Sequence, residues 1–458
     1  MKVFFATRSK HYFSHYQTVL AALCARGHEI GHYTDMFWNG GKIEKFGIEE
    51  FEREHKGRFS SFPLAIDGYD ARWLTHTHRH LASLAGYFVH PERSEFFTVR
   101  WAQFSVKNRL SRPIQWLQNT KIVKWICIAL HHMGFFALME RLTPIPPHVL
   151  RQIEEAQPDI VIVTPGNMRF SNEVDYIKAA RKLGIPSAVL TLTWDSLSTK
   201  GTLCARPDML FCWNEMHHDE ARRFHGIPDE NISVAGATIF EKWMNGATPP
   251  DNAPAFPSDS GLDPQKPTLM YLGSSRNIAR DDAWLAREIH EKLRELDMQL
   301  IVRPHPKNDS HFGALDGLEG LYVWPSGGEV LETPEWRATM RRSFKACIGV
   351  VGINTSALLD AIILDVPCIV YMTEEYRRTQ EEVLHFQALR EDMATIKISD
   401  AAELTEILPE LADGIDKTAD ARKEFVGKFI FPGGASVPPG EFIVGRLEDM
   451  CAEGIRSR

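Results

Sequence analysis

The sequence predicts an α/β protein with two doubly wound domains. Strand-like apolar runs alternate with helix-like amphipathic runs through residues 1–245 and again through 268–432. Such alternation is typical of parallel sheets covered by helices. Between the two series, residues 246–267 contain six prolines and few apolar side chains. This stretch is typical of an interdomain linker.

The first domain opens with a strand, a helix and a second strand. Residues 2–7 form a short apolar run, residues 17–27 have helical apolar spacing ending at Gly27, and residues 30–35 again suit a strand. Further along, the same signals predict strands at 158–164, 186–194 and 208–214, with a helix at 172–185.

The second domain repeats this pattern after the linker. Strands are predicted at 268–273, 299–304, 344–351 and 367–372, and helices at 282–297 and 356–365. Residues 433–458 are expected to form a C-terminal helix that packs back on the first domain. In open parallel sheets, ligands bind beyond the carboxyl ends of the strands, so two such sheets facing across a cleft would place a site between them.

Composition narrows the function classes. The formal charge of −8 argues against a general nucleic-acid binder, because phosphate backbones are met by net positive charge. Seven cysteines without a C-x-x-C pair suggest neither a disulfide framework nor a zinc site and fit a reducing cytosol. The N-terminal apolar run is interrupted by Arg8 and Lys10, so no signal peptide is expected there. The alternating His76, His78 and His80 have no carboxylate or cysteine beside them, and we expect no metal site.

Three predicted strands of the second domain are followed by polar loops that suit a phosphate. One loop begins with Gly273, Ser274 and Ser275, the second is the proline-stiffened segment with Arg303, His305 and Lys307, and the third carries Asn354, Thr355 and Ser356 before a helix. Cationic side chains and the N–H groups at a helix start both attract phosphate. The alternative is that Thr355 or Ser356 only caps the helix.

The segments VRPHPK, GINTSALLDAIILDVPCIVYMTEEYRRTQEEVLHF and GGAS resemble the nucleotide-binding half of GT-B glycosyltransferases of bacterial surface-polysaccharide biosynthesis. TWDSLSTKG and the segment at 212–243 resemble the N-terminal half of the same group. Related folds are CDP-glycerol glycerophosphotransferases, HP-motif sialyltransferases and non-hydrolysing nucleotide-sugar 2-epimerases.

The resemblance implies a GT-B enzyme of the cell envelope. It would transfer a sugar, or a polyol phosphate, from a UDP-, CDP-, CMP- or GDP-linked donor to a glycan or lipid-linked acceptor, without a tightly bound cofactor. By this resemblance His305, Lys307, Thr355 and Ser356 would contact the donor phosphates. Glu374 or Glu375 would hold the ribose.

Two residues of the first domain are candidates for the base that deprotonates an acceptor hydroxyl. His15 lies in the loop after the first strand, where related enzymes carry a histidine, but the glycine and proline that flank that histidine are absent here. Asp195 follows a later strand, beside Ser196, Ser198 and Lys200. His15 could equally be a surface histidine, and Asp195 a helix cap or a partner for Lys200.

A basic and aromatic segment interrupts the first domain, within an expected helical insertion at about 70–150. Residues 96–139 contain no acidic residue, six basic residues and three tryptophans. Two interpretations stay open. The segment could fold against the first domain, as a dimer contact or acceptor channel, or it could lie on an anionic membrane surface and hold a cytoplasmic protein at the inner face of the membrane.

Two other functions compatible with these observations remain. A nucleotide-sugar epimerase would use the same two domains and phosphate loops, and it would convert its donor without an acceptor. A catalytically inactive assembly partner would keep the fold and lack a base.

Overall fold

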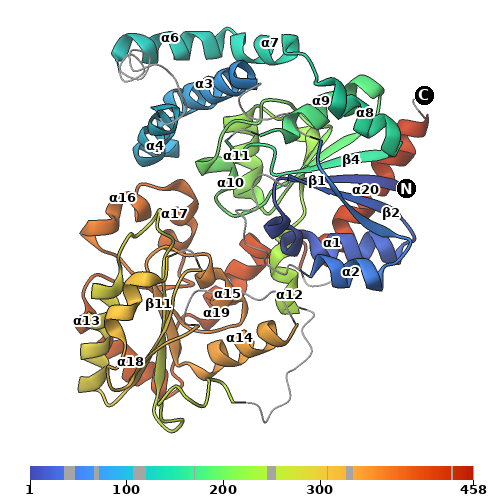
Figure 1. The fold of residues 1–458 in the computed structure, drawn as a ribbon. Helices are drawn as coiled ribbons and strands as arrows, with labels where there is room; N and C mark the ends of the chain where they lie inside the picture. The colour runs from blue at the N-terminus through green and yellow to red at the C-terminus, as the bar shows by residue number, and fades with distance from the viewer. Residues whose placement is uncertain are drawn as a thin grey trace. The chain divides into compact units, whose positions relative to one another are not determined.

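A computed structural model of the chain describes residues 1–35, 47–65, 72–106, 120–169, 171–244, 254–306, 308–325, 334–434 and 437–456 (Figure 1). It divides into two compact units. The first contains residues 1–241 together with 429–458, and the second contains residues 242–428. The proline-rich stretch at 246–267 overlaps the undescribed residues 245–253, and its remainder has no strand or α-helix.

Within the described residues, seven parallel strands form the sheet of the first unit, in the order β3-β2-β1-β4-β5-β6-β7. The order reverses direction between β1 and β4, as in doubly wound nucleotide-binding folds. The strands are β1 (Lys2–Thr7), β2 (Glu29–Thr34), β3 (Phe59–Pro63), β4 (Ile160–Thr164), β5 (Ser187–Leu190), β6 (Met209–Cys212) and β7 (Ile232–Val234).

Helices cover both faces of this sheet. On one face α1 (Phe13–Ala25) and the C-terminal α20 (Pro439–Arg456) pack on alternate residues of β1 such as Phe5. On the other face α8 (Pro147–Ala156) and α9 (Glu173–Leu183) pack on the intervening residues such as Phe4. Because both faces are covered, the strands read as continuous apolar runs, and this is why β1 was predicted at its observed bounds.

A group of helices leaves the first unit between β3 and α8 (Figure 1). Helix α3 (Trp73–Val89) packs against α4 (Glu95–Val106), α6 (Lys121–His132) and α7 (Phe135–Leu142). Residues 107–119 of this insertion are outside the described residues. Every element described between β3 and α8 is helical.

The second unit has the same topology. Six parallel strands of its described residues follow the order β10-β9-β8-β11-β12-β13. They are β8 (Thr268–Leu272), β9 (Gln299–Arg303), β10 (Leu321–Val323), β11 (Gly349–Gly352), β12 (Cys368–Tyr371) and β13 (Ile396–Ile398). The helices that connect them include α13 (Ala283–Glu295), α14 (Pro334–Ala346), α15 (Ala357–Ile363) and α18 (Leu404–Ala412).

One strand begins later than predicted. The sequence run at 344–351 was interpreted as a single strand, but Phe344 and Ala346 belong to α14 and β11 starts at Gly349. Both parts of the run contain buried apolar residues, Phe344 at the end of the helix and Val350 and Val351 in the strand. Periodicity over so few residues does not separate a buried helix end from a buried strand.

The chain returns to the first unit for its last residues. The backbone N–H of Ala237 donates to the carbonyl of Ile430, and the N–H of Gly440 donates to Glu241 Oε1 at 2.6 Å. A Cβ atom at Gly440 would lie 3.1 Å from the Thr18 carbonyl carbon of α1. Glycine at this position therefore lets the start of α20 approach α1 closely.

Candidate functional site

The candidate donor site lies at the carboxyl edge of the second sheet, where the strand order reverses between β8 and β11. Leu272 pairs with Arg303 on one side and with Gly352 on the other. The three polar loops predicted from the sequence therefore leave three neighbouring strands at the same level. This is the position at which open α/β sheets bind their ligands.

The loop after β8 is packed tightly against the loop after β9. The N–H of Gly273 donates to the carbonyl of Arg303 at 2.9 Å, and a Cβ atom at Gly273 would lie 3.1 Å from the backbone nitrogen of His305. Ser274 is fully buried, and its hydroxyl has no hydrogen-bond partner in the described residues. The carbonyl of Ser275 accepts the N–H groups of residues 278 and 279, which turns the loop toward α13.

The loop after β9 agrees with the rigid segment inferred from its prolines. Strand β9 ends at Arg303, and the carbonyl of His305 accepts the N–H of Asn308 at 2.9 Å, so the chain turns at once. His305 is half-buried beside the Gly273 loop. The Arg303 guanidinium lies over the Phe344 ring, 5.2 Å from its centre. Lys307, the third predicted cation, is outside the described residues.

In the loop after β11, the three predicted polar side chains have different roles. Asn354 is buried and its amide donates to the carbonyl of Thr379 at 2.6 Å, which is a structural contact. Thr355 Oγ1 accepts the N–H of Ala357 at 3.4 Å, which is a long hydrogen bond. This contact resembles the helix cap that was the alternative interpretation of Thr355. Ser356 precedes α15, makes no side-chain capping bond and is exposed. Its hydroxyl is therefore the one presented to solvent.

The predicted ribose residues follow the next strand. Glu374 and Glu375 begin a short 3-10 helix immediately after β12, and both are exposed. Glu374 Oε1 accepts Arg377 Nε at 3.2 Å. They lie at the same edge of the sheet as the other loops, one strand further from the reversal of strand order.

Beneath these loops lies a buried polar scaffold that sequence reasoning did not identify. Asp282 is fully buried and accepts hydrogen bonds from Tyr271, from the N–H of Ser274 and from His311, at 2.9, 3.1 and 2.7 Å. Burial raises the pKa of the Asp282 carboxyl, while these three donors act against the rise. Asp282 precedes α13, where a sequence reader expects only a helix cap.

Two further side chains tie the loops together. Asn308 donates to the carbonyls of Ser274 and Ala279, both at 2.9 Å, and so joins the β9 and β8 loops. Gln380 donates to the carbonyls of Ile353 and Tyr371 at 3.1 and 2.7 Å and so joins the β11 and β12 loops. The loops are therefore held in place by the protein itself, a pre-organisation that reduces the entropic cost of binding a ligand.

The first unit has its own polar edge, at the carboxyl ends of β1, β4 and β5. His15, on the first turn of α1, makes a 3.2 Å hydrogen bond from Nδ1 to the carbonyl of Leu192. Because a carbonyl oxygen only accepts, Nδ1 carries the proton and Nε2 is the basic nitrogen of this tautomer. Such an orientation is what a histidine general base requires.

Asp195 follows β5 and is extensively paired. Its carboxylate accepts Thr193 Oγ1 at 2.6 Å, Thr199 Oγ1 at 2.8 Å and Lys200 Nζ at 2.8 Å. Its side chain makes no capping bond to α10 (Ser196–Thr199). The structure thus gives Asp195 the partner role toward Lys200 that was one of its alternative interpretations. His15 and Asp195 lie in the same region, because Leu192 is only three residues before Asp195.

Arg8 and Glu173 at this edge were missed. Arg8 directly follows β1, is buried, and donates to the carbonyl of Arg169. Glu173, at the first turn of α9, is buried and accepts the Ser171 hydroxyl at 2.6 Å. Burial raises the pKa of Glu173, and the positive charge of Arg8 opposes the rise. The position of Arg8 immediately after a strand was the available signal, whereas Glu173 looked like an ordinary residue of an amphipathic helix.

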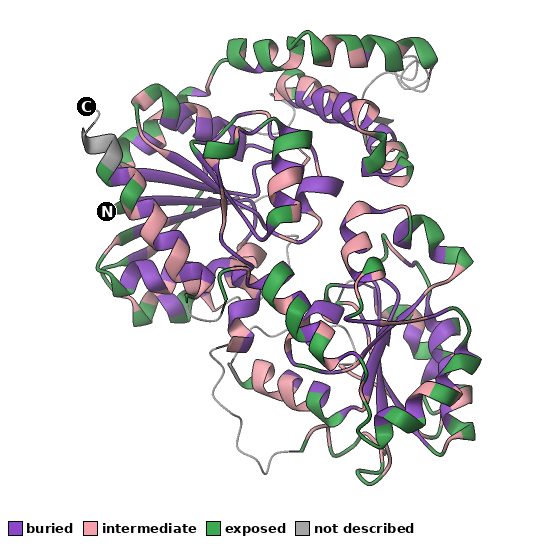
Figure 2. Cartoon of the chain, turned by 180° about the vertical axis from the view of Figure 1, so that it is seen from behind, coloured by how far each residue is buried: buried purple, intermediate pink, exposed green. Residues whose placement is uncertain are grey.

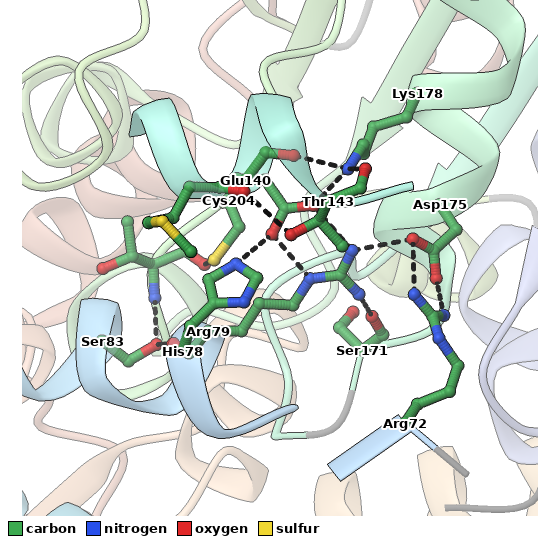
Figure 3. Close-up of polar contacts among 12 residues, drawn as sticks. Arg72, His78, Arg79, Ser83, Glu140, Thr143, Ser171, Asp175, Lys178 and Cys204 are labelled. Carbon is green, nitrogen blue, oxygen red and sulfur yellow. Dashed lines mark hydrogen bonds and ion pairs between the residues drawn. The ribbon is translucent and has the colours of Figure 1, made fainter. Parts of the chain in front are cut away.

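An ionic network joins the helical insertion to this unit (Figure 3). Glu140 of α7 accepts Arg79 Nη2, His78 Nε2 and Lys178 Nζ at 2.7, 2.7 and 2.8 Å. Arg79 also donates to Asp175 of α9 at 2.7 Å. Burial alone would raise the pKa of Glu140, but its three donors outweigh burial and hold that pKa well below its usual value. The network therefore fastens α3 and α7 to α9.

The histidines of α3 lie in different environments. His76 and His80 are buried, and burial lowers the pKa of each to about 4, while His78 is bonded to Glu140. In the part of the chain that the structure describes, no group of three or more histidine, cysteine, aspartate or glutamate side chains could hold a metal ion.

Comparison with known proteins gives the fold. No protein-family model matches the sequence, and no curated protein matches it significantly. The UDP-GlcNAc 2-epimerase of Methanocaldococcus jannaschii aligns with a TM-score of 0.54 at 15% identity, over 98% of this chain and 99% of that chain. The UDP-GlcNAc 2-epimerase of Neisseria meningitidis, solved with UDP-GlcNAc bound, aligns with a TM-score of 0.54 at 11% identity, over 98% and 100%.

A glycosyltransferase is also among the matches. SnogD from Streptomyces nogalater aligns with a TM-score of 0.48 at 13% identity, over 98% of this chain and 99% of that chain. At such identities the two epimerases establish the fold alone. With the two parallel sheets, they confirm the predicted fold class, a two-domain Rossmann-like GT-B fold.

Proposed function

We propose that the protein is a nucleotide-sugar-dependent glycosyltransferase that moves a sugar, or a polyol phosphate, to a surface glycan or its lipid-linked precursor. The observation that carries the proposal is the meeting of three polar loops on neighbouring strands β9, β8 and β11. His305 and Ser356 lie on these loops, which Asn308 and Gln380 hold in place. A diphosphate has the charge and acceptor oxygens for such donors.

We assign the donor loops to the second unit and the candidate base to the first. His15, oriented by Leu192, would act as the base for the acceptor hydroxyl, since Asp195 already accepts three hydrogen bonds. A carboxylate stabilised by three donors is a weaker base than an oriented neutral imidazole.

A nucleotide-sugar epimerase is the second candidate. It is favoured by the likeness to the two UDP-GlcNAc 2-epimerases, one of them solved with UDP-GlcNAc, at TM-scores of 0.54. The helical insertion favours the transferase instead. An epimerase acts on a soluble donor alone, so an exposed apolar surface on α6 and α7 has no role in its reaction.

Two measurements test the proposal. Thermal unfolding is first followed with UDP, GDP, CMP and CDP, because a ligand that binds the native state raises the midpoint by mass action. UDP is tried first, given the UDP-GlcNAc complex. The matching nucleotide sugar is then incubated with and without a lipid-linked glycan extract. Release of nucleotide only with the acceptor supports the transferase.

Conversion of the donor to its epimer without an acceptor would replace the transferase by the epimerase. Binding of the nucleotide with neither reaction, over a range of donors and acceptors, would favour the inactive assembly partner.

A further inference from the structure

Helices α6 and α7, whose ribbons are largely coloured as exposed or intermediate in Figure 2, carry an exposed apolar surface, here called the α6–α7 face. The exposed fractions of its large side chains run from 38% for Phe135 to 79% for Met133. Extended apolar surface on a folded protein marks an interaction site. The α6–α7 face consists of Ile122, Trp125, Ile126, Met133, Phe135, Leu138 and Leu142.

The exposed apolar side of α6 is separate from the side by which this helix packs on the protein. Ile122, Trp125 and Ile126 are spaced by three and four residues and share one side of the helix. The buried Cys127 lies on another side, and the helix packs there against α3. Helix α6 therefore has a packed side that belongs to the protein and an apolar side that points outward.

The charge around the face has one sign. Lys121 is exposed at the start of α6 and Arg141 near the end of α7, and both flank this face, whereas Lys124 lies toward α3 with its Nζ 5.8 Å from the centre of the Phe88 ring. Glu140 is the only acidic residue in the sequence between Lys121 and Leu142, and it is buried against Arg79 and Lys178. The acid-free sequence 96–139 continues this character on the N-terminal side. The α6–α7 face thus combines apolar side chains, a tryptophan and positive charge.

The lengths of α6 and α7 suit helices that lie along a bilayer surface and do not cross it. Helix α6 has 12 residues and α7 has eight, or roughly 18 and 12 Å of length, compared with about 30 Å for the hydrocarbon core of a bilayer. Among the described helices no single one is long and apolar enough to cross a membrane, and α6 and α7 meet that criterion only together, across a 69° bend. Since α6 also packs on α3, one side of it stays on the protein.

We propose that the α6–α7 face binds the surface of an anionic lipid bilayer, with its apolar side chains among the headgroups and acyl boundary and Lys121 and Arg141 at the phosphates. Tryptophan and lysine on an amphipathic helix are typical of this position. A second copy of the chain would fit less well, because a twofold contact places the same patch against itself and would oppose the positive charges of one copy to those of the other.

The test is sedimentation of the full-length protein with vesicles of phosphatidylcholine containing phosphatidylglycerol, compared with pure phosphatidylcholine. We expect binding to the anionic vesicles only, weakened by salt. The variant Lys121→Gln/Arg141→Gln should lower the partition coefficient about fivefold for each charge removed, which is about 1 kcal/mol per charge. Its matched control is Lys56→Gln, an exposed lysine of the same unit away from the insertion.

The apolar part is tested by Trp125→Gln/Met133→Gln, which should remove the binding that persists at high salt. Met393→Gln in the second unit is the control, because Met393 is 74% exposed and so resembles Met133. If the unmodified protein stays in the supernatant with anionic vesicles at low salt, the proposal is wrong. It is also wrong if the protein does not bind vesicles and light scattering finds a dimer that dissociates in the Trp125→Gln/Met133→Gln variant. Nucleotide binding is assigned to the other unit, so its loss or retention does not affect this test.

Discussion

His15 Nδ1 and the Leu192 carbonyl oxygen are 3.2 Å apart and join the first turn of α1 to the loop after β5. This contact orients the imidazole at the edge of the first sheet. We therefore expect His15→Ala to lower turnover by about two to four orders of magnitude, the range for loss of a general base, with nucleotide affinity unchanged. Steady-state kinetics and calorimetry separate the two quantities.

The same experiment on Asp195 should give a different result. Asp195→Asn keeps the shape but removes the charge that pairs with Lys200, so we expect mainly a loss of stability, on the order of 1 kcal/mol for this partly exposed pair. If Asp195→Asn abolishes turnover and His15→Ala does not, the roles are reversed. Normal turnover in both variants would place the base elsewhere.

The donor site is tested by two substitutions in the second unit. His305→Ala and Ser356→Ala should each weaken nucleotide binding by roughly one to two orders of magnitude, because each removes one phosphate contact worth about 1.5–3 kcal/mol. Ser260→Ala is the control, since Ser260 precedes β8 and lies toward the opposite edge of the sheet. If calorimetry gives both variants the nucleotide affinity of Ser260→Ala, the nucleotide does not bind at these loops.

The buried ionic network should anchor the insertion. Glu140→Gln leaves Arg79, Lys178 and His78 around a neutral side chain, and removing one partner of a buried ion pair costs about 3–5 kcal/mol. We expect the free energy of unfolding to fall by that order and proteolysis to begin within α6 and α7. The exposed Glu154→Gln on α8 is the control. An unfolding curve identical to that of the control would show that the network does not hold the insertion.

Acid should destabilise the first unit through its buried histidines. Burial lowers the pKa of His76, His80 and His217 to about 4, and of His32 and His225 to about 3. The unfolded value is about 6.5, so the unfolded chain binds more protons between these limits. The stability contributed by these histidines is fully present above pH 6.5 and decreases as the pH falls toward 4, by about 1.4 kcal/mol per histidine per pH unit. Glu220, whose pKa burial raises to about 8, acts with the opposite sign and offsets about one of the five histidines.

Denaturant unfolding at several pH values measures this dependence. His80→Gln should make the slope shallower by one histidine. A flat profile between pH 6.5 and 5 would contradict the prediction.

The sequence predicted the central strands well because parallel strands buried on both faces are continuous apolar runs, as in β1 and β9. It did not reveal the edge strands β7, β10 and β13, which have three residues each and carry too little pattern. The three donor loops were found because each follows a strand. The buried residues that hold these loops were not found from the sequence. The hydrogen bonds from Asn308 to Ser274 and from Gln380 to Ile353 join segments that are far apart in sequence. Glu140 likewise gives no sign in the sequence that it meets Arg79.

The return of residues 429–458 to the first unit has a consequence for biosynthesis. The second unit is continuous in sequence, from residue 242 to 428, whereas the first is made of both ends of the chain. On the ribosome, the second unit can complete its fold while the first still lacks α20, whose Ile443, Val444 and Leu447 fill the core beside α1. The unit whose synthesis begins first is therefore completed last. A nascent chain released before residue 439 would carry a finished second unit and a first unit with an exposed apolar face, the kind of surface that chaperones bind.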